Sequence, residues 1–89
     1  MTAEDGRFFC YILECADGTL YTGWTTDPGR RLQEHNQGTG AKYTQPRRPV
    51  ELYYLEEHPD RSSAMSREYQ IKQLSHASKR KLGENGTTG

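Results

Sequence analysis

The order of apolar and polar positions predicts three strands and two helices. Residues 8–14 and 19–25 are rich in aromatic and β-branched side chains, as strands are, and residues 50–56 form a third such segment. The mostly polar segment 28–37 and the segment 61–74, whose apolar side chains recur at helical spacing, predict helices. The expected fold is a small α+β domain with a three-stranded mixed sheet flanked by helices, in the order β-β-α-β-α.

Capping residues mark the ends of these helices. Asp27 and Pro28 suit the N-cap and the first helical position, and Gly38 can close the first helix. Ser75 can cap a further helical segment that ends near Leu82, which would add a third helix after the second.

The loop between the first two strands determines which tyrosines share a face of the sheet. Ala16-Asp17-Gly18 predicts a three-residue hairpin loop, because Gly18 can adopt the left-handed conformation without steric cost. With that loop Tyr11 and Tyr21 lie on the same side of the sheet, whereas a two-residue loop would place them on opposite sides.

The length of 89 residues allows one small domain. We assign residues 8–82 to the domain, residues 1–7 to an N-terminal arm, and residues 83–89, which contain no apolar side chain, to a disordered tail. No apolar run is long enough to span a membrane and no secretory signal opens the chain. We therefore expect a cytoplasmic protein without membrane contact.

The formal net charge is +0, but the charges are segregated along the chain. Residues 28–49 and 61–82 are basic, whereas residues 1–27 and 50–60 are acidic. Two basic segments in one small domain can form a surface that faces phosphates. Two ordinary solvated helix faces are the alternative interpretation.

Glu68 is the most informative acidic residue. It falls on the apolar stripe that Ala64, Met65, Ile71 and Leu74 form in the second predicted helix. A carboxylate turned toward a core is unfavourable unless it is paired or binds a metal, and Mg²⁺ near phosphates commonly uses one carboxylate and several waters. The alternative is a salt bridge at the edge of the stripe.

Arg31 and His35 are four residues apart, so they are neighbours on one face of the first helix, while Arg30 points elsewhere. An arginine can bind a phosphate with two hydrogen bonds, and a histidine beside it can relay a proton. A surface pair is the alternative, just as Tyr11 and Tyr21 taken singly could be core tyrosines.

Three motifs resemble those of the GIY-YIG endonucleases. Cys10-Tyr11-Ile12 and Tyr21-Thr22-Gly23 resemble the family's paired tyrosine signature, with its usual spacing between the tyrosines. Residues 23–36 resemble the family's arginine helix, and Ser66-Arg67-Glu68-Tyr69 resembles its later glutamate motif. The segments 40–44 and 47–50 are most similar to the small stand-alone bacterial branch, which is close to the catalytic subunit of a eukaryotic structure-specific endonuclease.

This resemblance covers residues 8–82 and implies a catalytic set. The residues that match it are Tyr11, Tyr21, Arg31, His35 and Glu68. The resemblance makes Glu68 the ligand of Mg²⁺ or Mn²⁺. The sequence departs from the family pattern in three ways: the first motif lacks its leading glycine, Thr26 occupies a position where several members have lysine, and no residue matches the asparagine that some members use after the glutamate.

The function expected from these features is Mg²⁺-dependent hydrolysis of DNA phosphodiester bonds, with structure-specific substrates in repair or recombination as the finer expectation. A tyrosine would take the proton from water, and nearby cations would have to lower its pKa from about 10. The residues expected to grip the DNA backbone or stack on a base are Arg30, Lys42, Tyr43, Arg47 and Arg48.

Two alternatives stay open. One is a DNA-binding module with weak or lost catalysis. The other is a subunit that depends on a protein partner for its substrate. In each case the chain is expected to be a monomer. The nuclease hypothesis predicts that all five catalytic side chains line one concave, water-open site, and that Arg30 points away from it.

Overall fold

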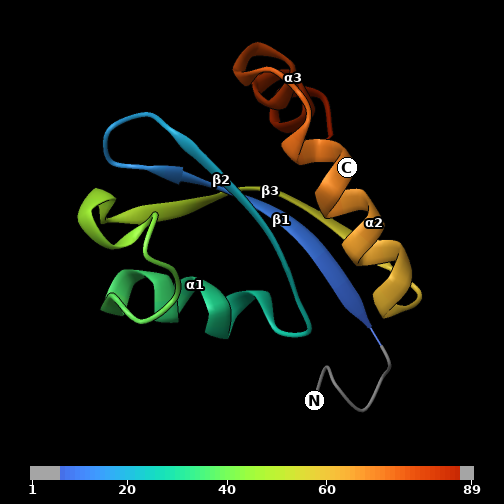
Figure 1. The fold of residues 1–89 in the computed structure, drawn as a ribbon, viewed down its shortest axis with the longest axis horizontal. Coiled ribbons are helices and arrows are strands. Elements are labelled where there is room, and N and C mark those ends of the chain that lie inside the picture. Colours follow the sequence, from blue (N-terminus) through green and yellow to red (C-terminus); the bar gives the residue numbers. More distant parts are fainter. Residues whose placement is uncertain (1–6, 87–89) are drawn as a thin grey trace.

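The structure, a computed structural model, describes residues 7–86 (Figure 1). The expected order of elements is confirmed, including the additional helix. The elements are β1 (Phe8–Cys15), β2 (Leu20–Thr25), α1 (Pro28–Gln37), a 3₁₀ turn η2 (Gln45–Arg47), β3 (Val50–His58), α2 (Arg61–Lys72) and α3 (His76–Gly86). Among the described residues, no helix is long and apolar enough to cross a bilayer.

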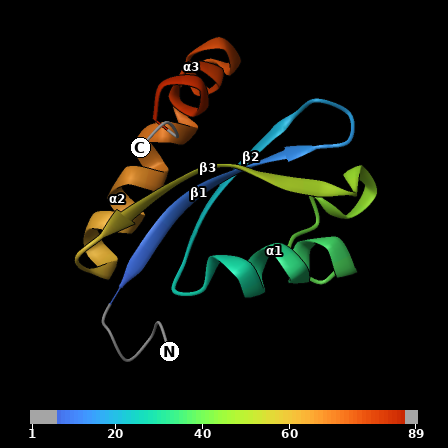
Figure 2. The ribbon, with the colours of Figure 1, turned by 180° about the vertical axis from the view of Figure 1, so that it is seen from behind.

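The sheet has the strand order β2-β1-β3, and both pairs of neighbouring strands are antiparallel. The expectation of a mixed sheet is therefore wrong. After α1 the chain returns beside β1 instead of β2, so the two strands that run parallel are never neighbours. Figures 1 and 2 show α1 on one side of the sheet and α2 on the other, with β2 as an edge strand between them.

The hairpin has the expected three-residue loop. Tyr11 pairs with Gly23 and Leu13 pairs with Tyr21, so both tyrosines lie on the face toward α1. Gly18 has φ 86°, the left-handed conformation in which glycine avoids the strain that other residues meet.

Each face of the sheet carries its own apolar cluster. The cluster toward α1 contains Tyr11, Leu13, Cys15 and Val50, with Tyr21, Leu32 and Leu55 packed against it. The cluster toward α2 contains Cys10, Ile12, Leu20, Tyr54 and Ile71. The central strand β1 therefore contributes alternate side chains to two separate cores.

The helix α1 is positioned by polar contacts at both ends. Asp27 caps it by accepting a hydrogen bond from the Arg30 N–H, and Gly38 ends it at φ 87°. Near its end the Asn36 side chain bonds both backbone groups of Val50, at 2.7 Å to the nitrogen and 2.9 Å to the oxygen. These bonds attach a mostly polar helix to the first residue of β3.

The apolar stripe expected in α2 is only half correct. Ala64 and Ile71 are fully buried, but Met65 is 47% and Leu74 is 37% exposed. Met65 follows Ala64 directly and so points about 100° away from it around the helix. Leu74 lies beyond the last residue of α2, in the turn toward α3.

The disordered tail expected from residue 83 is wrong at its start, because α3 continues to Gly86 and Gly83 is buried. A Cβ atom on Gly83 would collide with the ring of Tyr53, so only glycine lets α3 approach that ring. The Tyr53 hydroxyl donates to the Arg80 carbonyl at 2.6 Å. Residues 87–89 of the expected tail, and residues 1–6 of the expected arm, lie outside the described residues.

Ile71 and Met65 provide a direct test of this arrangement. Ile71→Ala should lower the free energy of unfolding by about 2–5 kcal/mol, because it leaves a cavity beneath β1 and β2. Met65→Ala removes an exposed side chain and should change it by less than about 0.5 kcal/mol. Urea unfolding measures both, and equal losses for the two variants would contradict the observed orientation of α2.

Candidate active site

The phenol of Tyr11 lies across Gly23, its partner on the edge strand β2. A Cβ atom on Gly23 would be 2.5 Å from the Tyr11 hydroxyl oxygen and 2.7 Å from the ring carbon that carries it. Such contacts are far inside van der Waals distance, so only glycine leaves room for the ring. Tyr11 is 2% exposed as a result.

The Tyr11 hydroxyl begins a chain of buried hydrogen bonds. Its oxygen is 3.1 Å from His35 Nε2, and His35 Nδ1 is 2.8 Å from the hydroxyl oxygen of Thr44. The Thr44 hydroxyl donates to the Ala41 carbonyl at 3.1 Å. Because that hydroxyl proton is already used, Thr44 accepts from His35 Nδ1–H, which leaves Nε2 unprotonated. The network therefore assigns the Tyr11 hydroxyl as the donor and His35 as the acceptor.

The loop after α1 holds His35 and Arg31 together. Gly40 lies so close to His35 that a Cβ there would be 2.5 Å from Nδ1, and the Gly40 carbonyl accepts a hydrogen bond from Arg31 Nη2 at 3.0 Å. Arg31 Nη1 also pairs with Glu34 at 2.9 Å. These contacts fix the guanidinium beside Tyr11.

Burial determines the charge state of this cluster. It raises the pKa of Tyr11 to about 12, against the opposing effect of the Arg31 guanidinium. Burial also lowers the pKa of His35, and the positive charge of Arg31 lowers it further. Tyr11 is thus a neutral phenol and His35 a neutral imidazole at neutral pH. Tyr11 in the free protein is therefore not the acidic tyrosine that a simple base mechanism needs.

Tyr21 lies between the buried cluster and the surface. Its ring centroid is 5.1 Å from that of His35 and 5.9 Å from that of Tyr43, with which it is stacked. The Arg47 guanidinium covers the Tyr43 ring at 4.0 Å. Tyr43 is 40% exposed, but a base could stack on it only after Arg47 moves.

The other residues expected to bind DNA are at the surface. Lys42 and Arg48 are exposed, and Arg48 Nε donates to the Gln45 carbonyl at 2.7 Å. The side chain of Arg30 is 74% exposed and pairs with Glu34 at 3.2 Å, which agrees with the expectation that it points away from the cluster.

Among the described residues, Glu68 makes no hydrogen bond or ion pair with the other four candidate residues. It lies on α2, which packs on the opposite face of β1 and β2, and its carboxylate pairs with Lys72 at 3.1 Å. It still raises the pKa of Tyr11 slightly through its charge, so the two groups are electrostatic neighbours. The expectation of one water-open site is wrong for Tyr11 and for His35, which is fully buried.

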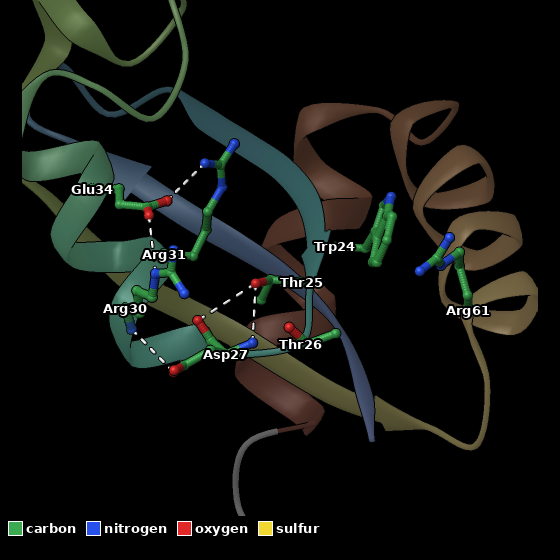
Figure 3. A pocket seen from close by; sticks show the side chains of 8 residues that line it. All are labelled: Trp24, Thr25, Thr26, Asp27, Arg30, Arg31, Glu34 and Arg61. Atoms are coloured by element: carbon green, nitrogen blue, oxygen red, sulfur yellow. Dashed lines mark hydrogen bonds and ion pairs between the residues drawn. The ribbon is translucent and has the colours of Figure 1, made fainter. Parts of the chain in front are cut away.

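An open hollow of about 540 Å³ lies where β2 turns into α1 (Figure 3). Arg31 belongs both to this hollow and to the buried cluster, so it connects the two. The hollow is lined by Trp24, Thr25, Thr26, Asp27, Arg30, Arg31, Glu34 and Arg61.

A divalent metal would be bound in this chain by one carboxylate ligand and water. Within the described residues no three His, Cys, Asp or Glu side chains gather into a metal-binding group. Glu34 is engaged by Arg30 and Arg31, whereas the Lys72 partner of Glu68 is half-exposed and can turn away. Mg²⁺ commonly binds through one carboxylate and keeps several waters, which Glu68 could satisfy.

Sequence reasoning missed four residues of this region: Gly40, Thr44, Trp24 and Arg61. Gly40 and Thr44 belong to the segment 40–44, whose only signal is its resemblance to the small bacterial branch, and their contacts with His35 cross a loop whose path the sequence does not determine. Trp24 directly follows the second tyrosine motif, and Arg61 directly follows an N-cap aspartate. Trp24 also lies in the segment 23–36 that resembles the arginine helix, and Arg61 begins the basic segment 61–82, but neither feature indicates that the two side chains meet.

The antiparallel sheet, the arginine helix and the tyrosine–histidine cluster are those of a GIY-YIG catalytic domain. Residues 7–81 match the GIY-YIG catalytic domain family, and the chain belongs to it.

Relatives of the same small size support this assignment. A UPF0213 protein of Halobacterium salinarum is 58% identical over 81% of this chain and 94% of its own length. One of Haloquadratum walsbyi is 52% identical over 89% of each chain. Solution NMR structures of a UPF0213 protein from Bacillus halodurans and a protein from E. faecalis superpose with TM-scores of 0.58 and 0.63 at 43% and 41% identity. They cover 92% and 93% of this chain and 88% of each of theirs.

Two glycine substitutions test the close approach of Tyr11 to β2. Gly23→Ala should lower the free energy of unfolding by about 1–3 kcal/mol, because the new methyl group overlaps the Tyr11 phenol. Gly29→Ala, in the exposed first turn of α1, meets nothing closer than 3.9 Å and should raise it by about 0.5–1 kcal/mol. Urea unfolding of the pair measures both, and a neutral Gly23→Ala would refute the contact.

Proposed function

We propose that this protein is a DNA endonuclease that depends on Mg²⁺ or Mn²⁺ and hydrolyses phosphodiester bonds. Membership of the GIY-YIG family supports the class of reaction. The observation that carries the proposal is the buried chain from Tyr11 through His35 to Thr44, with Arg31 beside it. This arrangement places His35, which can accept a proton, close to Arg31, which could bind a phosphate.

In the proposed reaction Tyr11 relays a proton. The attacking water gives a proton to the Tyr11 oxygen while the Tyr11 proton passes to His35 Nε2. The resulting hydroxide attacks phosphorus, the bond from phosphorus to the 3′ oxygen breaks, and that oxygen takes a proton from solvent. The proton on His35 then returns through Tyr11 to solvent, which restores the neutral pair. The raised pKa of Tyr11 is then no obstacle, because Tyr11 never has to exist as a free phenolate.

The other catalytic roles follow from charge and position. Arg31 would bind the scissile phosphate through its guanidinium. The Tyr21 hydroxyl has no hydrogen-bond partner among the described residues, so it is free to contact a phosphate oxygen. Glu68 would hold the metal after Lys72 releases it. The metal, when bound, supplies charge neutralisation at the phosphate and the leaving oxygen.

The finer proposals concern the substrate. Arg30, Lys42 and Arg48 place exposed positive charge around the hollow and the loop after α1, where a DNA backbone could lie. We propose substrates with specific structures in repair or recombination, in the cytoplasm, with the protein acting as a monomer. A protein partner that presents the DNA is compatible with this arrangement.

A DNA-binding module without catalysis is the second candidate. Two observations favour it: Tyr11 is almost inaccessible, and Glu68 is already paired with Lys72. For catalysis, the binding of DNA must expose Tyr11 and separate Glu68 from Lys72. The two candidates differ in whether a metal leads to cleavage.

Cleavage of labelled flap, fork and duplex DNA separates these candidates. The wild type should nick at least one of these substrates with Mg²⁺ and none with EDTA, and Glu68→Gln should abolish nicking while DNA binding in EDTA is unchanged. Binding without any nicking above the Glu68→Gln background would establish the second candidate.

Arg31→Ala and Arg30→Ala form a matched pair within the same assay. Arg31→Ala should lower the cleavage rate at saturating DNA by about 100-fold or more, which is typical when a charge-stabilising donor is lost. Arg30→Ala should leave that rate nearly unchanged and weaken binding with a smaller salt dependence. Equal rate losses for the two variants would contradict the assigned role of Arg31.

A further inference from the structure

The hollow at the end of β2 contains an aromatic–cation pair that the mechanism above does not use. Trp24 and Arg61 face each other across it, and the guanidinium carbon of Arg61 is 5.7 Å from the Trp24 ring centroid (Figure 3). Among the described residues Arg61 has no carboxylate partner. A positive charge at the first residue of a helix also opposes the helix dipole, so Arg61 does not stabilise α2.

A second aromatic–arginine pair near the site, Tyr43 and Arg47, is held more tightly than Trp24 and Arg61. Arg47 lies 4.0 Å from the Tyr43 ring centroid and is held there by Asp17 at 3.2 Å and by the Tyr43 carbonyl at 2.6 Å. The spacing of Arg61 from Trp24 is near the outer limit of about 6 Å for such contacts. Trp24 is thus a partly buried ring, tilted against Phe8 at 6.2 Å between ring centroids, and Arg61 covers it only loosely.

The position of this pair relates it to the proposed chemistry. Arg31, the proposed ligand of the scissile phosphate, lines the same hollow. A nucleotide next to that phosphate would reach toward Trp24 and Arg61. An aromatic ring can stack on a base and an arginine can bind a phosphate, so together they match both parts of one nucleotide.

We propose that Trp24 and Arg61 form a subsite for one unpaired nucleotide of DNA beside the phosphate at Arg31. The base stacks on Trp24, and the nucleotide's phosphate pairs with Arg61. Within a duplex both faces of a base are covered by its neighbours, so the subsite takes a nucleotide from a single strand, a flap or a fork. This inference rests on the proposed function, which it deepens by naming the substrate feature.

The first test uses the intrinsic fluorescence of Trp24, which is the only tryptophan in the chain. The wild type is titrated with an oligothymidylate strand and with a blunt duplex, in EDTA so that no DNA is cut. Stacking predicts that the single strand quenches the emission and that the duplex does not. Equal quenching by both, or none by either, would overturn the proposal.

Variants then assign the effect to the two side chains. Trp24→Leu and Arg61→Gln should each weaken oligothymidylate binding about fivefold or more, as measured by anisotropy of a labelled strand, because a base–aromatic stack is lost in one and a phosphate contact in the other. Lys81→Gln removes an exposed cation from α3, far from the hollow, and should change binding less than about twofold. Equal losses in all three variants would refute the subsite.

Cleavage assays distinguish failure of this inference from failure of the proposed function. Metal-dependent nicking without any change in Trp24 fluorescence would refute the subsite and leave the endonuclease intact. Quenching by the single strand without nicking would support the subsite and refute the endonuclease.

Discussion

The Tyr11 phenol lies across Gly23 with its hydroxyl against His35 Nε2, and the rest of the site depends on this contact. It requires the three-residue hairpin loop, since a shift of one residue in register would turn Tyr11 or its partner to the other face. It also requires α1 to be docked on the sheet so that His35 meets the hydroxyl. The bonds of Asn36 to Val50 and of Thr44 to His35 provide that docking.

The same burial that positions Tyr11 and His35 keeps both of them neutral. The pKa of His35 is lowered from its usual 6.5 by burial, so the unfolded chain binds a proton there at higher pH than the folded chain does. The free energy of unfolding therefore decreases as pH falls below about 6.5, and above it the contribution of His35 is fully present. A neutral imidazole is also the form that can accept a proton, which links stability of the site to its proposed chemistry.

Local signals predicted the elements well, because a capping residue or a turn glycine acts on its own neighbours. Asp27, Pro28 and Gly38 begin and end α1 as expected, and Gly18 sets the hairpin. No local sequence signal indicates which edge of the hairpin β3 joins, because that depends on tertiary packing. The expectation of a mixed sheet was wrong for this reason, since β3 pairs with β1 and is antiparallel to it.

In the candidate site too, local features could be predicted from the sequence and tertiary contacts could not. Register placed Tyr11 and Tyr21 on one face of the sheet, and helical spacing placed Arg31 beside His35, but only the family resemblance joined the two pairs into one site. Glu68 could be assigned to the helix α2, but the place of its carboxylate relative to the other four depends on how that helix packs on the sheet. The loop contacts of Gly40 and Thr44, and the approach of Arg61 to Trp24, arise between segments distant in sequence, where spacing carries no information.

The central claim is that Tyr11 donates its proton to a neutral His35. The ¹⁵N spectrum of the His35 ring at neutral pH, recorded for the wild type and for Tyr11→Phe, tests it most directly. We expect Nδ1 to be protonated and Nε2 unprotonated in the wild type, with the Nε2 resonance shifted when the hydroxyl is removed in Tyr11→Phe. A protonated Nε2 in the wild type, or an Nε2 resonance that does not respond to Tyr11→Phe, would contradict the account.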